Sequence, residues 1–334
     1  MILWGLFWIV SNRDVDDGIG KISKLFIPLL FIIMAFIFIY AFTLPGFNLG
    51  VSTLLTPNWG LLLDVHIWLA AFAQIIFSLS IGQAMAYTYA SYLSKETKLI
   101  DSVLMVIVAN SLYEIFIAFG IFSILGFMAE THSVPINQLI TEGTSLIFIV
   151  LPEIFSQMGI MGRILAPLLF LGVLFAGFTS SLALFEPLLN SLCDKMNWSR
   201  KKGVSILAII ACCGSLLFST GISSYLVEIV DTFVNEFGIL ILIAIESIIF
   251  TWCYDVDSLI PILNKNSRWH VGKKWKFVLK YVLPLMLIVM WIGGIAKIIY
   301  ELDPFKLSVY ILILIIVVAL SILFTKLKPN NNNA

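Results

Sequence analysis

The chain has 334 residues, of which 60% are hydrophobic and 12% are charged, and its mean hydropathy is +1.03. A water-soluble domain cannot bury that much apolar surface, so the composition excludes a soluble globular protein. The formal net charge is zero, which gives no support for a nucleic-acid partner.

Apolar runs of about 20 residues match the ~30 Å hydrocarbon core of a bilayer when they are helical. Helices are required, because lipid offers no hydrogen bonds to an exposed backbone. The fold class is therefore an all-α integral membrane protein with about eight transmembrane helices. In chain order the predicted spans are Leu25–Leu44, His66–Leu93, Ile100–Met128, Ile164–Leu192, Val204–Ile222, Phe237–Tyr254, Phe277–Ile299 and Leu307–Phe324.

Lysine and arginine are unequally divided between the two sides of these spans. If the spans alternate in direction, 17 of the 20 basic residues fall on one side, and only Arg163, Lys297 and Lys306 fall on the other. By the positive-inside rule the majority side is cytoplasmic. We therefore predict a multi-pass protein of the plasma membrane with both termini in the cytoplasm.

Two long connections, Pro45–Val65 and Ala129–Arg163, fall on the outer side. The second contains a short apolar run, Leu146–Leu151, followed by Pro152, and this run is too short to cross a bilayer. We predict a short helix folded onto or into the outer face at this point. At the C-terminus, residues 326–334 include an asparagine run and are expected to be a disordered cytoplasmic tail.

Polar side chains cluster at the middle of three spans. An ionisable group at bilayer depth costs about 2.5–3.5 kcal/mol on insertion scales and normally faces a partner or a cavity. Three clusters at one depth thus indicate one shared site, and neutral oxygens suit a small hard cation. The clusters are Ser78, Ser80, Gly82 and Gln83 in the second span, Asn110 and Glu114 in the third, and Thr179, Ser180 and Ser181 in the fourth.

The spacing of these residues supports a shared site without excluding a simpler role. Asn110 and Glu114 are four residues apart, so they share a helix face. Small and hydroxylated residues also permit close helix packing, and that alternative stays open for Ser78 and for Thr179 with its neighbours. Packing does not explain the carboxylate of Glu114. Glu246, in the sixth span, has no polar cluster around it, and a functional and a structural role both stay open.

A small residue such as Gly82 allows a membrane helix to break. A broken helix leaves N–H and C=O groups at the level of the midplane, where they can hold a substrate and ions. The segment Gln74–Gln83 is placed to do this.

In this order the motifs resemble those of the neurotransmitter:sodium symporters, a family with the leucine-transporter fold. The similarity covers nearly the whole chain and follows the family's fifth to twelfth helices. The matching segments are Gly18–Pro28 on the fifth helix, Gln74–Leu93 on the broken sixth, Asn110 with Glu114 on the seventh, Leu151–Met158 in the fourth outer loop and Ala176–Pro187 on the eighth.

The resemblance implies a partial inverted-repeat bundle with a broken helix, and sodium ions that move with a small-molecule substrate. Ser78 and Asn110 would be ligands of a first sodium ion. The carbonyl of Ala176 and the hydroxyls of Thr179 and Ser180 would be ligands of a second.

The resemblance also implies a substrate pocket, two gates and a hinge. The pocket would be lined by Phe77, Ser80, Gln83, Ser180 and Leu184, with Phe77 as its lid. Asp231 would belong to the outer gate, and Tyr92 and Asp194 to the inner gate. Gly18 and Pro28 match an element that the family uses to open an inward solvent path.

Two departures from the family bear on ions and substrate. Glu114 lies where chloride-dependent members carry Ser, and a carboxylate supplies the negative charge itself, so we expect chloride-independent transport. Gln83 stands where the family often has an aromatic residue. We expect a substrate side chain that is smaller or more polar than that of leucine.

A third departure concerns the N-terminus. Met1–Val10 is too short to span a bilayer and resembles the inner end of the family's fourth helix. We assign residues 1–24 to this remnant with a cytoplasmic loop, and residues 25–325 to the transmembrane transporter domain. The family's first three helices, which carry other site residues, have no counterpart, so each sodium site is expected to be half built.

Two interpretations of function follow. In the first, the chain is part of a sodium-dependent symporter of an amino acid or related small amine and is inactive alone. The missing helices would then be encoded upstream of a wrongly assigned start, or they would be carried by a separate chain. In the second, it is a truncated membrane protein that does not transport. An enzyme is not expected, because His66, His132 and His270 lie at span ends or in loops and no base is aimed at Ser80 or Ser180.

Overall fold

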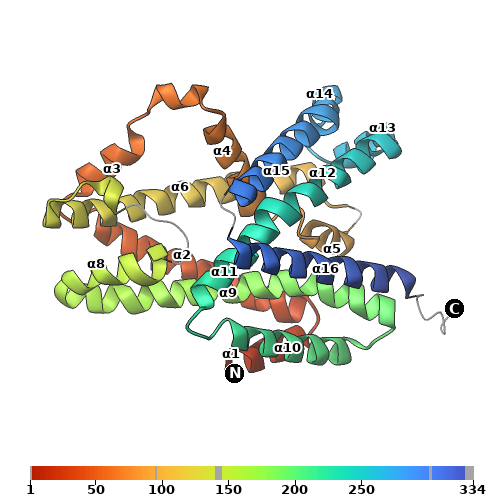
Figure 1. The fold of residues 1–334 in the computed structure, drawn as a ribbon, viewed down its shortest axis with the longest axis horizontal. Coiled ribbons are helices and arrows are strands. Elements are labelled where there is room, and N and C mark those ends of the chain that lie inside the picture. The colour runs from red at the N-terminus through yellow and green to blue at the C-terminus, as the bar shows by residue number, and fades with distance from the viewer. Residues whose placement is uncertain (1, 95, 140–144, 301–302, 328–334) are drawn as a thin grey trace. The chain divides into compact units, whose positions relative to one another are not determined.

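The computed structural model describes residues 2–94, 96–139, 145–300 and 303–327 (Figure 1). All regular structure in these ranges is helical, which agrees with the predicted all-α class. The predicted tail falls mostly on residues 328–334, outside the described ranges. The chain forms two compact units. The first unit comprises residues 1–8, 68–107 and 184–334, and the second unit comprises residues 9–67 and 108–183.

Six helices in the described ranges are long and apolar enough to cross a membrane, namely Asp16–Ala41, Leu99–His132, Gly159–Met196, Tyr225–Cys253, Lys273–Ala296 and Pro304–Lys326. They match six of the predicted spans and confirm the membrane class. The predicted span Val204–Ile222 is the helix α10 (Arg200–Leu217), which begins with three basic residues and ends five residues earlier than expected. The remaining predicted span, His66–Leu93, is a broken helix.

The second unit is built on four helical segments, α2 (Lys21–Ala41), α6 (Leu99–His132), α8 (Leu151–Gln157) and α9 (Gly159–Met196). The first residues of α6 and the last residues of α9 belong to the first unit. The core of the second unit includes Ile37 and Ile154, both fully buried, and Phe155 and Leu165, each 1% exposed. The predicted short outer helix is present as η4 (Leu146–Val150) and α8, and it packs into this core. The other elements are η1 (Asp16–Gly20), α3 (Phe47–Leu55), η2 (Trp59–Leu63) and η3 (Ile136–Gln138).

Close backbone contact joins α3 to α6 in the second unit. A Cβ atom added at Gly50 would lie 2.0 Å from the carbonyl oxygen of Phe122, so only glycine fits at this position. Small residues at such crossings let membrane helices approach closely. The resulting van der Waals contact stabilises the helix pair in lipid, where there is no hydrophobic driving force for association. The predicted outer connection Pro45–Val65 is therefore largely helical and anchored to a membrane helix.

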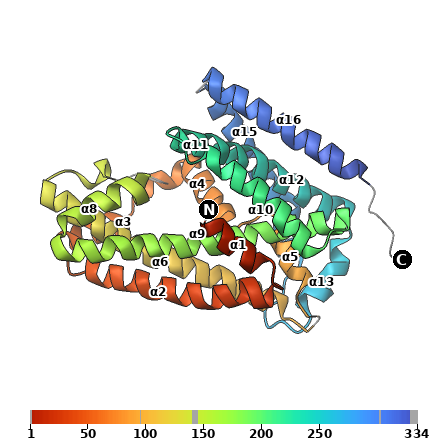
Figure 2. The same cartoon turned by 90° about the horizontal axis from the view of Figure 1, so that it is seen from below.

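The first unit is organised around α12 (Leu240–Ile248) and α15 (Leu283–Tyr300), which lie side by side (Figure 1). Leu287 is fully buried and Ala244 is 1% exposed where they meet. The helix α1 (Ile2–Ser11) lies beside α10, because the indoles of Trp4 and Trp8 donate hydrogen bonds to Ser215 and Ser205 at 3.1 and 2.9 Å (Figure 2).

The remaining elements of the first unit continue or flank these helices. They are α4 (Val65–Ser78, from residue 68 on), α5 (Met85–Ser91), α11 (Ser223–Thr232), η5 (Phe233–Ile239), η6 (Ile249–Cys253), α13 (Val256–Asn264), α14 (Lys273–Phe277), η7 (Val278–Val282) and α16 (Pro304–Lys326).

The predicted start of the sixth span, at Phe237, lies 12 residues after the start of the membrane helix. The membrane helix begins at Tyr225 and passes through α11 and η5. Hydropathy missed this part because it contains acidic residues, one of which forms an ion pair in the structure. Glu228 binds Lys306 at 2.8 Å, so the polar positions do not interrupt the helix.

Candidate functional site

The helix that begins at Val65 breaks at the level of the predicted polar cluster. The helix α4 ends at Ser78, and α5 begins at Met85. Three residues between them have left-handed backbone conformations, Ser80 (φ 52°), Gly82 (φ 79°) and Ala84 (φ 58°). This conformation is rare for residues other than glycine, so its presence at both Ser80 and Ala84 marks a specific structural feature. The predicted break is confirmed. The backbone N–H groups of Ser80 and Ile81 depart from the α-helical pattern and donate instead to the carbonyl oxygens of Phe77 and Ile76, each at 3.0 Å.

Gly82 lies against α12 and its preceding π-helical turn. A Cβ atom added at Gly82 would lie 2.5 Å from Cγ1 of Ile243 and 3.2 Å from Cγ2 of Ile239. Glycine is required here for two reasons, namely its positive φ and the lack of space for a Cβ atom beside Ile243.

Three of the predicted pocket residues of the first unit lie at this break, and a fourth lies on α9. Phe77 is the penultimate residue of α4 and is 59% exposed, while Ser80 and Gln83 lie within the break and are half-buried. Leu184, on the part of α9 that belongs to the first unit, is 47% exposed. Their roles in a pocket stay predictions.

Asn110 and Glu114 lie near the middle of α6 in the second unit, and their side chains interact as their spacing predicted. The amide Nδ2 of Asn110 donates a hydrogen bond to Oε1 of Glu114 at 3.1 Å. The amide oxygen of Asn110 and the carboxylate of Glu114 therefore lie on one face of the helix.

The predicted ligands of the second sodium ion also lie in the second unit, on one turn of α9. The hydroxyl of Thr179 donates to the carbonyl oxygens of Phe175 at 2.9 Å and Ala176 at 3.0 Å, and Ser180 is exposed beside it. The structure thus brings together the Thr179 and Ala176 oxygens. Phe175 also packs on Phe26 of α2, with ring centroids 4.3 Å apart, which fixes this turn.

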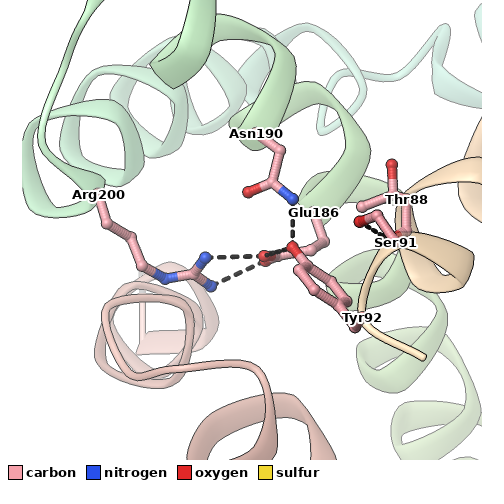
Figure 3. A network of polar contacts seen from close by, with 6 residues as sticks. All are labelled: Thr88, Ser91, Tyr92, Glu186, Asn190 and Arg200. Atoms are coloured by element: carbon pink, nitrogen blue, oxygen red, sulfur yellow. Dashed lines mark hydrogen bonds and ion pairs between the residues drawn. The ribbon is translucent and has the colours of Figure 1, made fainter. Parts of the chain in front are cut away.

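A polar network anchors the end of α5 in the first unit (Figure 3). Glu186 of α9 is fully buried, and its two oxygens accept hydrogen bonds from Arg200 at 2.7 and 2.8 Å. The hydroxyl of Tyr92, just after α5, donates to the same carboxylate at 3.1 Å and accepts a hydrogen bond from Asn190. The bidentate geometry makes this the strongest type of side-chain ion pair.

One of the two predicted inner-gate residues, Tyr92, lies in this network, and the gating role of both stays a prediction. Tyr92 contacts Glu186 and Asn190, and Asp194 lies exposed near the end of α9. Sequence reasoning missed Glu186 and Arg200, although Glu186 lies inside a predicted span. A carboxylate at that depth needs a partner, and that requirement could have singled it out.

The remaining predicted gate and hinge residues lie in regular helices. Asp231, on α11, is exposed and accepts a hydrogen bond from Asn235 at 2.8 Å. Gly18 lies in η1 and Pro28 in α2, within one continuous membrane helix. An added Cβ at Gly18 would lie 2.5 Å from the carbonyl oxygen of Val10, so this glycine permits close contact between η1 and the end of α1.

The model of the sodium:neurotransmitter symporter family matches residues 1–326. An uncharacterized sodium-dependent transporter of Methanocaldococcus jannaschii is 31% identical over 287 residues, 86% of this chain and 58% of that protein. The sodium- and chloride-dependent glycine transporter 2 of Xenopus laevis is 25% identical, over 84% of this chain and 36% of that protein.

The sodium-dependent nutrient amino acid transporter 1 of Drosophila grimshawi is 25% identical over 92% of this chain and 48% of that protein. This chain therefore spans between 36% and 58% of the length of these curated relatives.

Proposed function

This chain belongs to the sodium:neurotransmitter symporter family, and on that premise we propose that it acts in sodium-coupled symport of an amino acid or a related small amine. The observation that carries the proposal is the break between α4 and α5, with its three left-handed residues. A helix broken within the membrane presents backbone dipoles to ions and substrate, which is a design of secondary transporters that work by alternating access. Relatives named for glycine and nutrient amino acids support this substrate class.

The proposed ion ligands keep the roles that the family resemblance assigns to them. Asn110 would supply an amide oxygen and Ser78 a hydroxyl to the first sodium ion. Ala176, Thr179 and Ser180 would serve the second. Hard cations usually take about six oxygen ligands, so we propose that further helices complete both sites and that the 334-residue chain is inactive without them. Those helices would be part of a longer protein or a separate chain.

The proposal includes a location and a direction. The chain is a multi-pass membrane protein of a transporter family, and we place it in the plasma membrane with its termini in the cytoplasm, as the positive-inside rule predicts. Residues 25–325 form the proposed transporter domain. Transport requires no covalent step, so we assign no catalytic residue. Asp231 is the residue proposed for the outer gate, and Tyr92 and Asp194 are the residues proposed for the inner gate.

Uptake into proteoliposomes tests the function. We expect sodium-stimulated uptake of a small or polar amino acid when the gene is expressed with the coding sequence upstream of Met1, and none from the 334-residue chain alone. If the rate of uptake by the extended protein did not change with sodium concentration, the chain would not be part of a sodium-coupled symporter. Uptake that favours large aliphatic amino acids would contradict the assignment of Gln83 to the pocket.

Asn110→Ala is expected to raise the sodium concentration for half-maximal uptake about tenfold, equivalent to about 1.4 kcal/mol of ion binding, because one neutral oxygen ligand is lost. Ser123→Ala is the matched control on the same helix, because the Ser123 hydroxyl donates to the Phe119 carbonyl of α6 and Ser123 lies outside the predicted polar clusters. A sodium dependence that is equal in both variants would remove Asn110 from the ion site.

Chloride replacement tests the role proposed for Glu114. With gluconate in place of chloride we expect unchanged uptake, because the carboxylate supplies the negative charge that other members obtain from the anion. In Glu114→Ser that charge is absent, and uptake is expected to depend on chloride. A chloride requirement in the unaltered transporter would refute the role.

A further inference from the structure

A hydrogen bond connects the second half of the broken helix to α12 within the first unit. The hydroxyl of Tyr87, two residues into α5, donates to Oε1 of Glu246. Glu246 lies seven residues before the end of the membrane helix at Cys253, which places it about 10 Å inside the helix end at 1.5 Å per residue. Packing alone does not require a carboxylate at such a depth.

The same helix face touches the break itself. Ile239 and Ile243 contact Gly82, and Glu246 follows Ile243 by three residues. Positions spaced by three and four residues lie on one side of a helix. One face therefore contacts Gly82 within the break and Tyr87 just beyond it, so the two ends of a short segment are fixed to a single surface.

That surface is itself held in place by the helix beside it. Ser247, the next residue after Glu246, donates a hydrogen bond to the carbonyl oxygen of Leu279 at 2.8 Å. Leu287, fully buried, and Ala244 lie in the shared core of α12 and α15. Glu246 thus stands on a rigid base, which is what a residue that positions another element requires.

We propose that Glu246 is a positioning residue that acts through Tyr87 to set the orientation of the broken segment Ser80–Gln83. Ile243 limits how closely this segment approaches α12, and the Tyr87–Glu246 hydrogen bond fixes the direction in which α5 leaves it. The backbone groups of the break are thereby aimed before a ligand arrives. This inference rests on the proposed function in one respect only, namely that the substrate binds at the segment Ser80–Gln83.

The test measures the position of the break without requiring transport. The four native cysteines, Cys193, Cys212, Cys213 and Cys253, are replaced by serine, and Gln83→Cys is added as a probe in the membrane-embedded protein. The rate at which a small thiol reagent modifies this cysteine reports how the break is presented. Tyr87→Phe and Glu246→Ala are each expected to change that rate several-fold and to the same extent. The double variant should change it no further, because both act on one bond.

Two controls separate positioning from general loosening. Glu246→Gln keeps a side-chain carbonyl oxygen that can accept from Tyr87, so it should restore the original rate. Glu228→Ala removes another paired carboxylate of the same membrane helix and should leave the rate unchanged. An unchanged rate in Tyr87→Phe, or an equal change in Glu228→Ala, would overturn the proposal. Because the readout needs no substrate, loss of sodium-dependent uptake would count against the proposed function and not against this inference.

Discussion

Arg200→Ala is expected to lower the free energy of unfolding by about 3 kcal/mol, the low end for breaking a buried ion pair, because it leaves the Glu186 carboxylate without its charge partner. The low end applies because the Arg200 side chain is 25% exposed while Glu186 is fully buried. Tyr92 and Asn190 would remain near the carboxylate but carry no positive charge. Thermal melting of the purified protein in detergent measures the loss, expected as a drop of several degrees.

The first unit offers a matched control for this pair. The N–O distance between Lys306 and Glu228, 2.8 Å, is close to the 2.7 Å of the Arg200–Glu186 pair. The Glu228 side chain, however, is 60% exposed. Breaking an exposed pair typically costs less than about 1 kcal/mol, so Lys306→Ala should lower the melting temperature little. Combining Arg200→Ala with Glu186→Gln should recover part of the loss, since no buried charge is then left unpaired. Equal melting temperatures for the two alanine variants would show that the buried Arg200–Glu186 pair stabilises the protein no more than the exposed pair does.

The same network shows what sequence reasoning could and could not reach. Length and hydropathy are local properties, so the membrane helices and the all-α class were predictable from apolar runs. The break was predictable for a similar reason, because Gly82 and its polar neighbours are adjacent in the sequence. Glu186 and Arg200 are 14 residues apart across a helix end, and Tyr87 and Glu246 are 159 apart, so their pairing depends on tertiary packing.

The predicted start of the helix that contains α12 was wrong because local composition was misleading there. Glu228 and Asp231 lower the local hydropathy, and a window average counts them as the end of a span. In the structure Glu228 is paired with Lys306, and Ile229 on the same helix is 1% exposed. An average over composition cannot see which side of a helix each charge occupies.

Gly82→Ala is expected to destabilise the protein by about 3 kcal/mol and to reduce sodium-dependent uptake sharply. A left-handed backbone costs a residue with a Cβ about 1–2 kcal/mol, and overpacking a filled site costs about 1–3 kcal/mol. Both terms apply, because Gly82 has a φ of 79° and an added Cβ would lie 2.5 Å from the Ile243 side chain. Gly214→Ala in α10 is the control, since an added Cβ there meets no atom within 4 Å.

A double-mutant cycle separates the two costs of the Gly82 substitution. Ile243→Ala removes the side chain that an alanine at position 82 would meet, but it leaves the left-handed backbone unchanged. The combined variant should therefore cost about 1–2 kcal/mol less than the sum of the single variants, measured by thermal or denaturant unfolding. Strict additivity would mean that Gly82 is required for its backbone conformation alone. In that case the break would be set by its own turn and not by its contact with α12.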